Sequence, residues 1–290
     1  METKVKKSLI VVHPYVNYDP GRFLEDALRS IGFRIDLFDR AVDFNLVRQG
    51  LYDAVLFIES PYRQAVRVMN VNRVKIPRLY WVLHGESRLA YNLKFTQLYR
   101  IDYLLLATSL HLAKQYRLPY QLFPMAVEPG NIPNRLPLAE RSKDISFVGS
   151  FSKIYQERND LLNLIQKTFP QRKICFKTDT YLKEMGEIYA DSKIVFNWNY
   201  GNVLTMRLFE GMAAGSLMLT NYAHNIELLG QDGRHYVMYN GNDDLINKID
   251  HYLTHLEQTQ AIARAGYQKV LAEHTYLHRA RLLERIIRQL

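Results

Sequence analysis

The chain has 290 residues, of which 48% are hydrophobic and 23% are charged, so it can form about two ordinary domains and is too apolar to be disordered. Its 38 Lys and Arg against 29 Asp and Glu give a formal net charge of +9, which favours anionic partners such as nucleotide sugars, phosphate-bearing acceptors, membrane surfaces or nucleic acid. The one cysteine, Cys175, excludes a disulfide within the chain and a thiolate metal site, and it fits a reducing, cytoplasmic compartment.

The first half of the chain alternates short apolar runs with amphipathic segments. We expect strands at Ser8–Val12, Phe33–Phe38, Tyr52–Ile58, Leu79–Leu83, Tyr103–Ala107 and Tyr120–Phe123. Helices are expected from Pro20 to Ile31, at Phe44–Gln49, from Pro61 through Met69, at Arg88–Leu98 and at His111–Tyr116. This alternation predicts an α/β domain with a parallel sheet and helices on both faces.

The N-terminus resembles a signal peptide only superficially, because His13 and Pro14 interrupt its apolar run, and we interpret that run as the first strand. No segment has the roughly 20 apolar residues of a spanning helix, so we expect a soluble protein. Pro129, Gly130, Pro133 and Pro137 break any periodicity and predict a linker at 129–143, after a first domain at 1–128.

The second half repeats the alternation, with a domain expected at 144–275. Strands are expected at Asp144–Gly149, Lys173–Lys177, Lys193–Phe196, from Leu217 and at Arg234–Met238, and Cys175 is expected to be buried in one of them. Helices are expected at Tyr155–Phe169, Tyr181–Ala190, Leu245–Leu256, Gln258–Glu273 and Tyr276–Leu290.

The stretch from Asn197 to Thr220 has the strongest functional pattern. A loop of Asn197, Asn199, Tyr200, Gly201, Asn202, Val203 and Leu204 follows a strand, Thr205 can cap a helix, and Gly215 can end it in a left-handed conformation. Backbone amides at a helix N-terminus beside a strand's carboxyl end favour an anion. Arg207 and Glu210 share a helix face, where they suit a phosphate and ribose hydroxyls respectively. The alternative is an ordinary surface Arg–Glu pair.

Two further groups are candidates. Gly149, Ser150, Lys153 and Arg158 follow the first strand of the second half, and the cations can reach a diphosphate, unless they are solvated or Arg158 bonds a carboxylate. His84 and Glu86 end the fourth strand and could form an acid–base unit, although plain loops often contain this pair. Asp19, in the first loop of the same domain, could line the acceptor side or cap the first helix.

No metal site is expected. His274 and His278 are four apart, but no HExxH and no third ligand accompany them, and we favour packing or interdomain contact. Asp243 and Asp244 suit a helix cap better than a metal–diphosphate site. The sequence also lacks G-x-G-x-x-G and G-x-S-x-G.

The segment RLFEGMAAGSLMLTN, together with DISFVGSFSKIYQERNDLL, IPRLYWVLHGE and the tail ARAGYQKVLAEHTYLHRARLLERI, resembles glycosyltransferases of the GT-B fold. The resemblance is to the CgeB-like (spore maturation protein-like) group, related to glycosyltransferase family 4. It implies two Rossmann-like domains facing across a cleft, and a terminal helix, 276–290, that packs back on the first domain. It also implies that Glu210 binds the donor ribose, that the amides before it hold the diphosphate, and that the Gly149 loop faces the same cleft. Asn202 departs from the family pattern, which usually has an acid eight positions before this Glu.

The resemblance therefore implies a glycosyltransferase that uses a UDP- or GDP-linked sugar, with the acceptor, a glycan, lipid-linked or protein molecule, on the first domain. We expect it to be metal-independent, since cations and amides can neutralise the leaving diphosphate, and retaining. If it inverts, His84, Glu86 or Asp19 would be the base. The alternatives are a nucleic-acid-modifying glycosyltransferase, motivated by the charge, and a non-catalytic glycan- or partner-binding module, motivated by Asn202.

Overall fold

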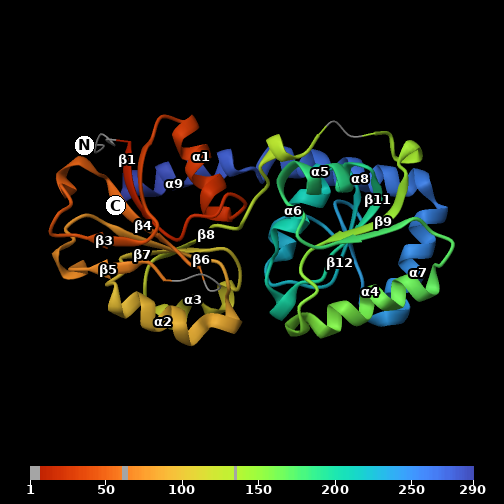
Figure 1. The fold of residues 1–290 in the computed structure, drawn as a ribbon, viewed down its shortest axis with the longest axis horizontal. Helices are drawn as coiled ribbons and strands as arrows, with labels where there is room; N and C mark the ends of the chain where they lie inside the picture. Colours follow the sequence, from red (N-terminus) through yellow and green to blue (C-terminus); the bar gives the residue numbers. More distant parts are fainter. Residues whose placement is uncertain (1–6, 61–64, 134–135) are drawn as a thin grey trace. The chain divides into compact units, whose positions relative to one another are not determined.

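Two parallel sheets organise the chain, each with helices on both faces (Figure 1). The computed structural model describes residues 7–60, 65–133 and 136–290. It divides into a first unit, residues 1–125 with 276–290, and a second unit, residues 126–275. Among the described helices, none is both long and apolar enough to cross a bilayer.

The first unit is built on a six-stranded sheet of order β2-β1-β4-β6-β7-β8. Its strands are β1 (Ser8–Val12), β2 (Arg34–Phe38), β4 (Ala54–Ile58), β6 (Arg78–Val82), β7 (Tyr103–Leu106) and β8 (Tyr120–Leu122). All pairs are parallel, and β1, which lies between β2 and β4, is buried along its whole length, as its apolar run predicts. One face carries α1 (Pro20–Ser30) and α9 (Tyr276–Gln289), and the other carries α2 (Leu89–Leu98) and α3 (Ala113–Tyr116).

Two of the helix predictions for this unit are wrong. Ala41–Asp43 (β3) and Arg67–Met69 (β5) pair in a separate two-stranded parallel sheet. The predicted helix at Phe44–Gln49 is a turn followed by a 3-10 turn, because Phe44 is buried in the core under this small sheet. The helix predicted through Met69 is extended at its end, and residues 61–64 lie outside the described ranges. Alternating Val66 and Val68 already suit a strand.

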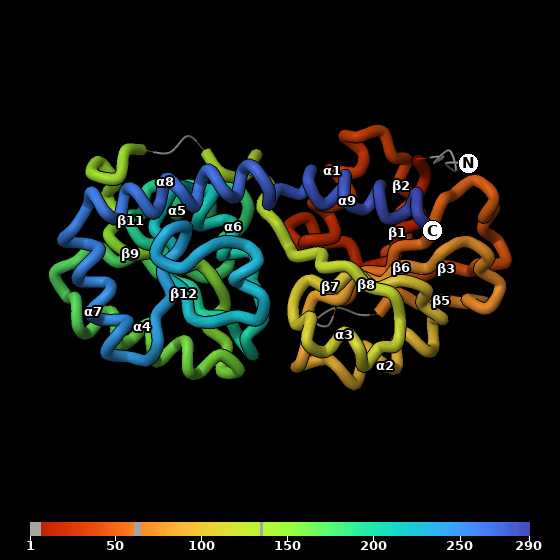
Figure 2. The backbone as a smooth tube through the Cα atoms, turned by 180° about the vertical axis from the view of Figure 1, so that it is seen from behind, coloured from red at the N-terminus to blue at the C-terminus, as the bar shows by residue number. Residues whose placement is uncertain are grey.

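Helix α9 completes the first unit from the far end of the chain. Figure 2 shows it beside α1, and the ring centroids of Phe23 and Tyr276 are 5.3 Å apart. Arg279, which is buried, donates from Nε to the carbonyl of Pro124 at 2.7 Å. Its apolar face, with Leu283 and Ile286, is buried as well.

The second unit has a five-stranded parallel sheet of order β10-β9-β11-β12-β13. Its strands are β9 (Lys143–Val148), β10 (Ile174–Lys177), β11 (Ser192–Phe196), β12 (Leu217–Thr220) and β13 (Val237–Met238). Helices α4 (Gln156–Thr168) and α7 (Gly241–Thr254) cover one face, and α5 (Leu182–Ala190), α6 (Met206–Ala213) and α8 (Leu256–Glu273) cover the other. The last strand is shorter than predicted, and Cys175 in β10 is half-buried rather than buried.

Short 3-10 helices complete the connections. They are η1 (Gln49–Leu51), η2 (Val71–Arg73), η3 (Glu86–Arg88), η4 (Leu110–Leu112), η5 (Pro129–Asn131), η6 (Leu138–Glu140), η7 (Lys153–Tyr155), η8 (Tyr200–Asn202) and η9 (Ile226–Leu228). At η5, the chain packs tightly against α5: a Cβ added to Gly186 would lie 1.9 Å from the carbonyl oxygen of Asn131. Only a residue without a side chain fits there.

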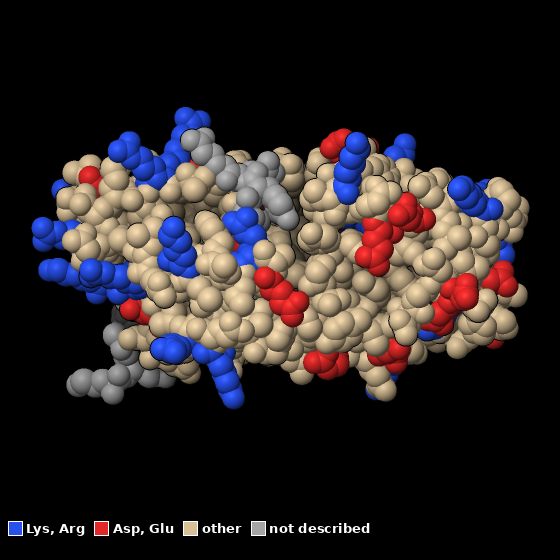
Figure 3. Space-filling view, turned by 90° about the horizontal axis from the view of Figure 1, so that it is seen from below, with Lys and Arg blue, Asp and Glu red and all other residues tan. Residues whose placement is uncertain are grey.

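Charge is unevenly divided between the units. The sequence places 22 Lys and Arg against 12 Asp and Glu in residues 1–125 and 276–290, but 16 against 17 in residues 126–275. Figure 3 shows one face of the molecule, on which basic side chains gather over the first unit and acidic side chains over the second. The net positive charge of the chain therefore belongs to its first unit.

Candidate functional site

Two arginines lie against one buried aromatic ring where β9 ends in the second unit. The ring belongs to Phe147, which is fully buried. The guanidinium carbon of Arg207, from α6, is 4.3 Å from the ring centroid, and that of Arg158, from α4, is 4.9 Å away. Helices from opposite faces of the sheet thus bring two cations to the carboxyl end of the same strand, where open α/β sheets bind ligands.

Arg207 is fixed by the ends of two neighbouring strands. Its Nε and Nη2 donate to the carbonyl of Val148 at 3.1 and 2.8 Å, and its Nη1 donates to Oδ1 of Asn197 at 2.8 Å. No carboxylate in the described ranges forms an ion pair with it, which rules out the predicted alternative of an Arg207–Glu210 surface pair. A guanidinium held by neutral acceptors keeps its charge available to an anion.

Arg158 likewise forms no ion pair with a described acidic side chain. It is 5% exposed, its Nη2 donates to the carbonyl of Ser150, and its guanidinium carbon lies 4.2 Å from the ring centroid of Tyr155. Burial, and then the charge of Arg207, lower the pKa of Arg158 to about 10. Within the part of the chain described, neither arginine forms an ion pair with a carboxylate. Two neighbouring cations of this kind destabilise each other, and an anion bound between them would remove that cost.

Asn197 holds this arrangement together. It is fully buried, and its Oδ1 accepts from Arg207 and from the hydroxyl of Thr205 at 3.1 Å. Its Nδ2 donates to Asn199 and to Thr220, each at 2.9 Å. Asn199 is also buried, and its own Nδ2 donates to Thr220. Because both amides are used within the protein, we assign them to positioning Arg207 and the loop.

The loop after β11 has the predicted turn. Gly201 and Asn202 both have φ of +57°, the left-handed conformation that their residue types tolerate. Tyr200 is exposed, and its ring meets that of Tyr155 edge to face at 5.4 Å. Val203 and Leu204, in contrast, are buried in the protein. They anchor the loop and can offer a ligand only their backbone.

Thr205 occupies the predicted N-cap position of α6 but does not cap the helix with its side chain. Its backbone is extended, as at an N-cap, yet its hydroxyl donates to Asn197 instead of accepting from a helix N–H. The positive end of the α6 dipole is therefore not neutralised by a side-chain cap. At the other end Gly215 has φ of +64°, and Gly215 N–H donates to Met212 while Ser216 N–H donates to Gly211, as predicted for a left-handed stop.

Glu210 lies one turn into α6. It is half-buried, and burial raises the pKa of its carboxyl group to about 7, although the charge of Arg207 acts in the opposite direction. No described residue forms a hydrogen bond or ion pair with this carboxylate. A carboxylate without protein donors beside a cationic pair can accept hydrogen bonds from the hydroxyl groups of a ligand.

Gly149 is required by Arg207. A Cβ at this position would lie 2.6 Å from Nη2 of Arg207 and 2.9 Å from the ring of Phe147. The residues after it turn outward: Ser150 and Lys153 are exposed, and Ser150 Oγ accepts from the N–H of Ser152 at 3.1 Å. Lys153 has no partner among the described residues, so it is free to reach a bound anion.

In the first unit, His84 and Glu86, which the sequence suggests as an acid–base unit, each lie beside another partner. Glu86 is exposed and its Oε1 lies 2.7 Å from Nε2 of His111. The carboxylate beside His84 is Glu59, which accepts from the N–H of Leu83 at 2.6 Å and of His84 at 2.7 Å, with its Oε2 3.6 Å from Nδ1 of His84. The sequence signal was present, since Glu59 directly follows the buried strand β4.

Asp19 stands at the N-cap position of α1, the alternative left open by the sequence. Its carbonyl accepts from the N–H groups of Arg22 and Phe23, but its side chain forms no capping bond. His274 is buried in the second unit with its ring 5.6 Å from that of Phe209, which fits packing.

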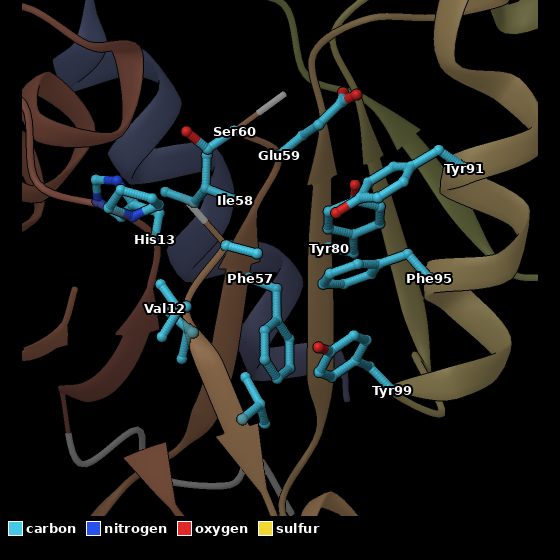
Figure 4. A pocket seen from close by; sticks show the side chains of 14 residues that line it. Val12, His13, Phe57, Ile58, Glu59, Ser60, Tyr80, Tyr91, Phe95 and Tyr99 are labelled. Atoms are coloured by element: carbon cyan, nitrogen blue, oxygen red, sulfur yellow. The ribbon is translucent and has the colours of Figure 1, made fainter. Parts of the chain in front are cut away.

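A small cavity adjoins Glu59 at the carboxyl ends of β1 and β4. Figure 4 shows His13 and Val12 on one side and the rings of Tyr80, Phe95 and Tyr99 on the other. Tyr80 stacks on Phe95 at 4.3 Å. The cavity has a volume of about 50 Å³, which has room for a few water molecules but not for a sugar.

Comparisons with known proteins agree with this architecture. Residues 137–285 match a family described as glycosyl transferase-like. A search of curated proteins finds no significant match. Among solved structures, sucrose-phosphate synthase from Thermosynechococcus elongatus is similar, with a TM-score of 0.68 and 12% identity over 97% of this chain and 98% of that one. Anabaena HepE in complex with UDP and glucose is also similar, with a TM-score of 0.68 and 8% identity over 98% of this chain and 100% of that one.

An alpha-glucosyltransferase in complex with UDP-glucose and DNA containing an abasic site gives a TM-score of 0.65 and 9% identity over 97% and 98% of the two chains. Structural matches at sequence identities this low show a shared fold and no more. The fold is GT-B, with two parallel α/β sheets, as the sequence predicts.

Proposed function

Since the chain belongs to the glycosyl transferase-like family and is a glycosyltransferase of GT-B fold, we propose that its second unit binds the diphosphate of a UDP-linked sugar between Arg158 and Arg207. One observation carries the proposal: the guanidinium groups of buried Arg158 and half-buried Arg207 share the Phe147 ring, and neither forms an ion pair with a described residue. Structural neighbours with the same fold contain UDP or UDP-glucose, which favours uridine over guanosine.

The remaining residues of the site take roles that fit this donor. The start of α6 adds backbone donors and a helix dipole to the arginine pair. Glu210 accepts hydrogen bonds from ribose hydroxyls, and exposed Lys153 reaches the outer phosphate. As the bond to the sugar breaks, charge builds on the leaving diphosphate, and both guanidinium groups stabilise it. We therefore propose a metal-independent reaction.

The test is isothermal titration of the full chain with UDP and GDP. We expect UDP to bind more tightly than GDP, and Arg158→Ala and Arg207→Ala to weaken binding at least tenfold, since each removes a charge-assisted bond. Arg207→Lys keeps a cation if the alanine variant misfolds. Arg234→Ala, an exposed arginine of the same unit, is the control. No binding of either nucleotide by folded wild type would refute the assignment.

Two properties of the reaction stay proposals with their own tests. Transfer should persist in excess EDTA if no metal takes part. Retention of configuration, proposed from the family 4 resemblance, would be read from the anomeric signals of the product by NMR. His84, now with Glu59 as its partner, and Glu86 or Asp19 remain the candidate bases if the product is inverted.

A second candidate is a glycosyltransferase that acts on nucleic acid. The observation that favours it is the net positive charge of the first unit, where Arg48, Arg67, Arg73 and Lys75 are exposed and form no ion pair with described residues. Two results would support it: affinity for duplex DNA that falls steeply as the salt concentration rises, and weaker DNA binding when these residues are replaced by Glu. Binding to anionic vesicles alone would point to peripheral membrane contact, and donor binding without turnover to a non-catalytic module.

A further inference from the structure

A second hollow, of about 440 Å³, opens in the second unit on the side of the sheet that α4 and α7 cover. Residues that follow β11, β12 and β13 line it, together with the first turns of α4 and α7. Its volume falls in the range of small-molecule sites, roughly 300–1,000 Å³. Neither arginine of the donor site is part of its wall. The proposed donor-binding residues therefore leave this space unexplained.

The uncompensated charge of the wall is negative. Glu157 forms no hydrogen bond or ion pair with any residue that the structure describes, and Asp232 accepts from the N–H of Met238 at 2.7 Å. The cation of the wall, Lys248, is already held by Asp244 and by the carbonyl of Met238, at 2.7 and 2.6 Å. A phosphate would meet two carboxylates here and no available cation, so a nucleotide is a poor ligand for this hollow.

The other groups of the wall suit a polyhydroxylated ring. Tyr222 is 50% exposed and offers an aromatic face. Trp198 also lines the hollow; it is buried, and its indole N–H forms no hydrogen bond with a described residue, so it remains available as a donor. The side-chain amides of Asn240 and Asn242 are exposed at the start of α7. Aromatic faces with carboxylates and amides can pack on sugar C–H groups and bond the hydroxyls.

We propose that this hollow is a second carbohydrate site, which binds an uncharged mono- or disaccharide separately from the nucleotide donor. The site goes beyond donor binding and does not depend on it. Its negative wall disfavours the diphosphate, which the arginine pair attracts. The second unit would thus carry two binding sites with opposite charge preference.

The two tryptophans of the chain make the proposal testable without a label. Trp81 is fully buried in the first unit, whereas Trp198 lines the hollow, so acrylamide quenching reports mainly on Trp198. We would titrate the full chain with a panel of neutral saccharides, including methyl glucosides, N-acetylglucosamine, maltose and chitobiose. At least one saccharide should reduce the acrylamide quenching of Trp198 in a saturable manner, and saturating UDP should not displace that saccharide.

Variants locate the binding. Tyr222→Ala should weaken it about threefold to tenfold, the range of one aromatic contact, and Glu157→Gln about tenfold. Tyr120→Ala, which replaces another exposed tyrosine, in the first unit, should leave saccharide binding unchanged. No saturable binding, insensitivity to both variants, or displacement by UDP would overturn the proposal. Competition by UDP-glucose but not UDP would assign the hollow to the donor's own sugar and overturn it too. Direct UDP titration of the same samples judges the donor site separately.

Discussion

Replacing Glu210 by Gln should stabilise the protein while it weakens donor binding. The pKa of this carboxyl group is raised from 4.5 to about 7 because burial disfavours its charge. Near pH 4 both the folded and the unfolded chain hold the proton, so the group makes no difference to stability. Between pH 4.5 and 7 the unfolded chain releases the proton and the folded chain keeps it, so stability falls as pH rises.

Above pH 7 the full cost is present. A shift of about 2.5 pKa units corresponds to about 3 kcal/mol, which is an upper limit for the gain on substitution by Gln. The measurement is urea unfolding of wild type and Glu210→Gln at several pH values from 4.5 to 8.5. Glu184→Gln, an exposed acid in the same unit, is the control and should show little change.

The same variant should bind UDP-glucose at least tenfold more weakly at pH 8, because a neutral amide replaces a charged acceptor of the ribose hydroxyls. Wild-type affinity should rise with pH through about 7, as the carboxylate ionises. A stability difference that does not change between pH 4.5 and 8.5 would contradict the buried-carboxylate argument. Unchanged UDP-glucose binding in the variant would contradict its role in the donor site.

Other substitutions test the packing around the arginines. Gly149→Ala puts a methyl group 2.6 Å from Nη2 of Arg207, so UDP affinity in titration should fall about tenfold with little loss of stability in urea unfolding; an unchanged affinity would refute the close fit. Asn197→Ala removes the amide that holds Arg207, and we expect a loss of about 1–3 kcal/mol in urea unfolding together with weaker UDP binding. Gly186→Ala should cost about 1–3 kcal/mol in the same assay while UDP affinity in the folded fraction is unchanged, since its Cβ would meet the backbone of Asn131 far from the arginines in sequence.

The sequence predicts the parts of this fold that local periodicity determines. In the β11–loop–α6–β12 segment, the left-handed Gly201, Asn202 and Gly215 follow the prediction, because turn and stop residues act within a few positions, whereas the Thr205 side chain does not cap α6. The small sheet of β3 and β5 was missed, since three-residue strands have no clear period and form only through a partner some 25 residues away.

In the site, too, local features could be predicted from the sequence and tertiary contacts could not. Arg158 and Arg207 could be nominated from their residue types and their place after strands, but their shared contact with Phe147 depends on two helices from opposite faces of a sheet. Asn197 was expected to contact a ligand because its loop lies at a strand end, whereas tertiary packing uses its amide within the protein. The partner of His84 was missed for a similar reason: Glu59 follows the neighbouring strand β4, 25 residues away in sequence.

The position of α9 has a consequence for how the chain matures. The second unit is continuous in sequence and can fold as soon as residues 126–275 have left the ribosome. The first unit begins earlier but lacks α9, which covers Phe23 and binds the carbonyl of Pro124 only after everything between them has been synthesised. The order of completion is therefore the reverse of the order of synthesis. A nascent chain stopped at Thr275 should present an uncovered α1 to chaperones and proteases.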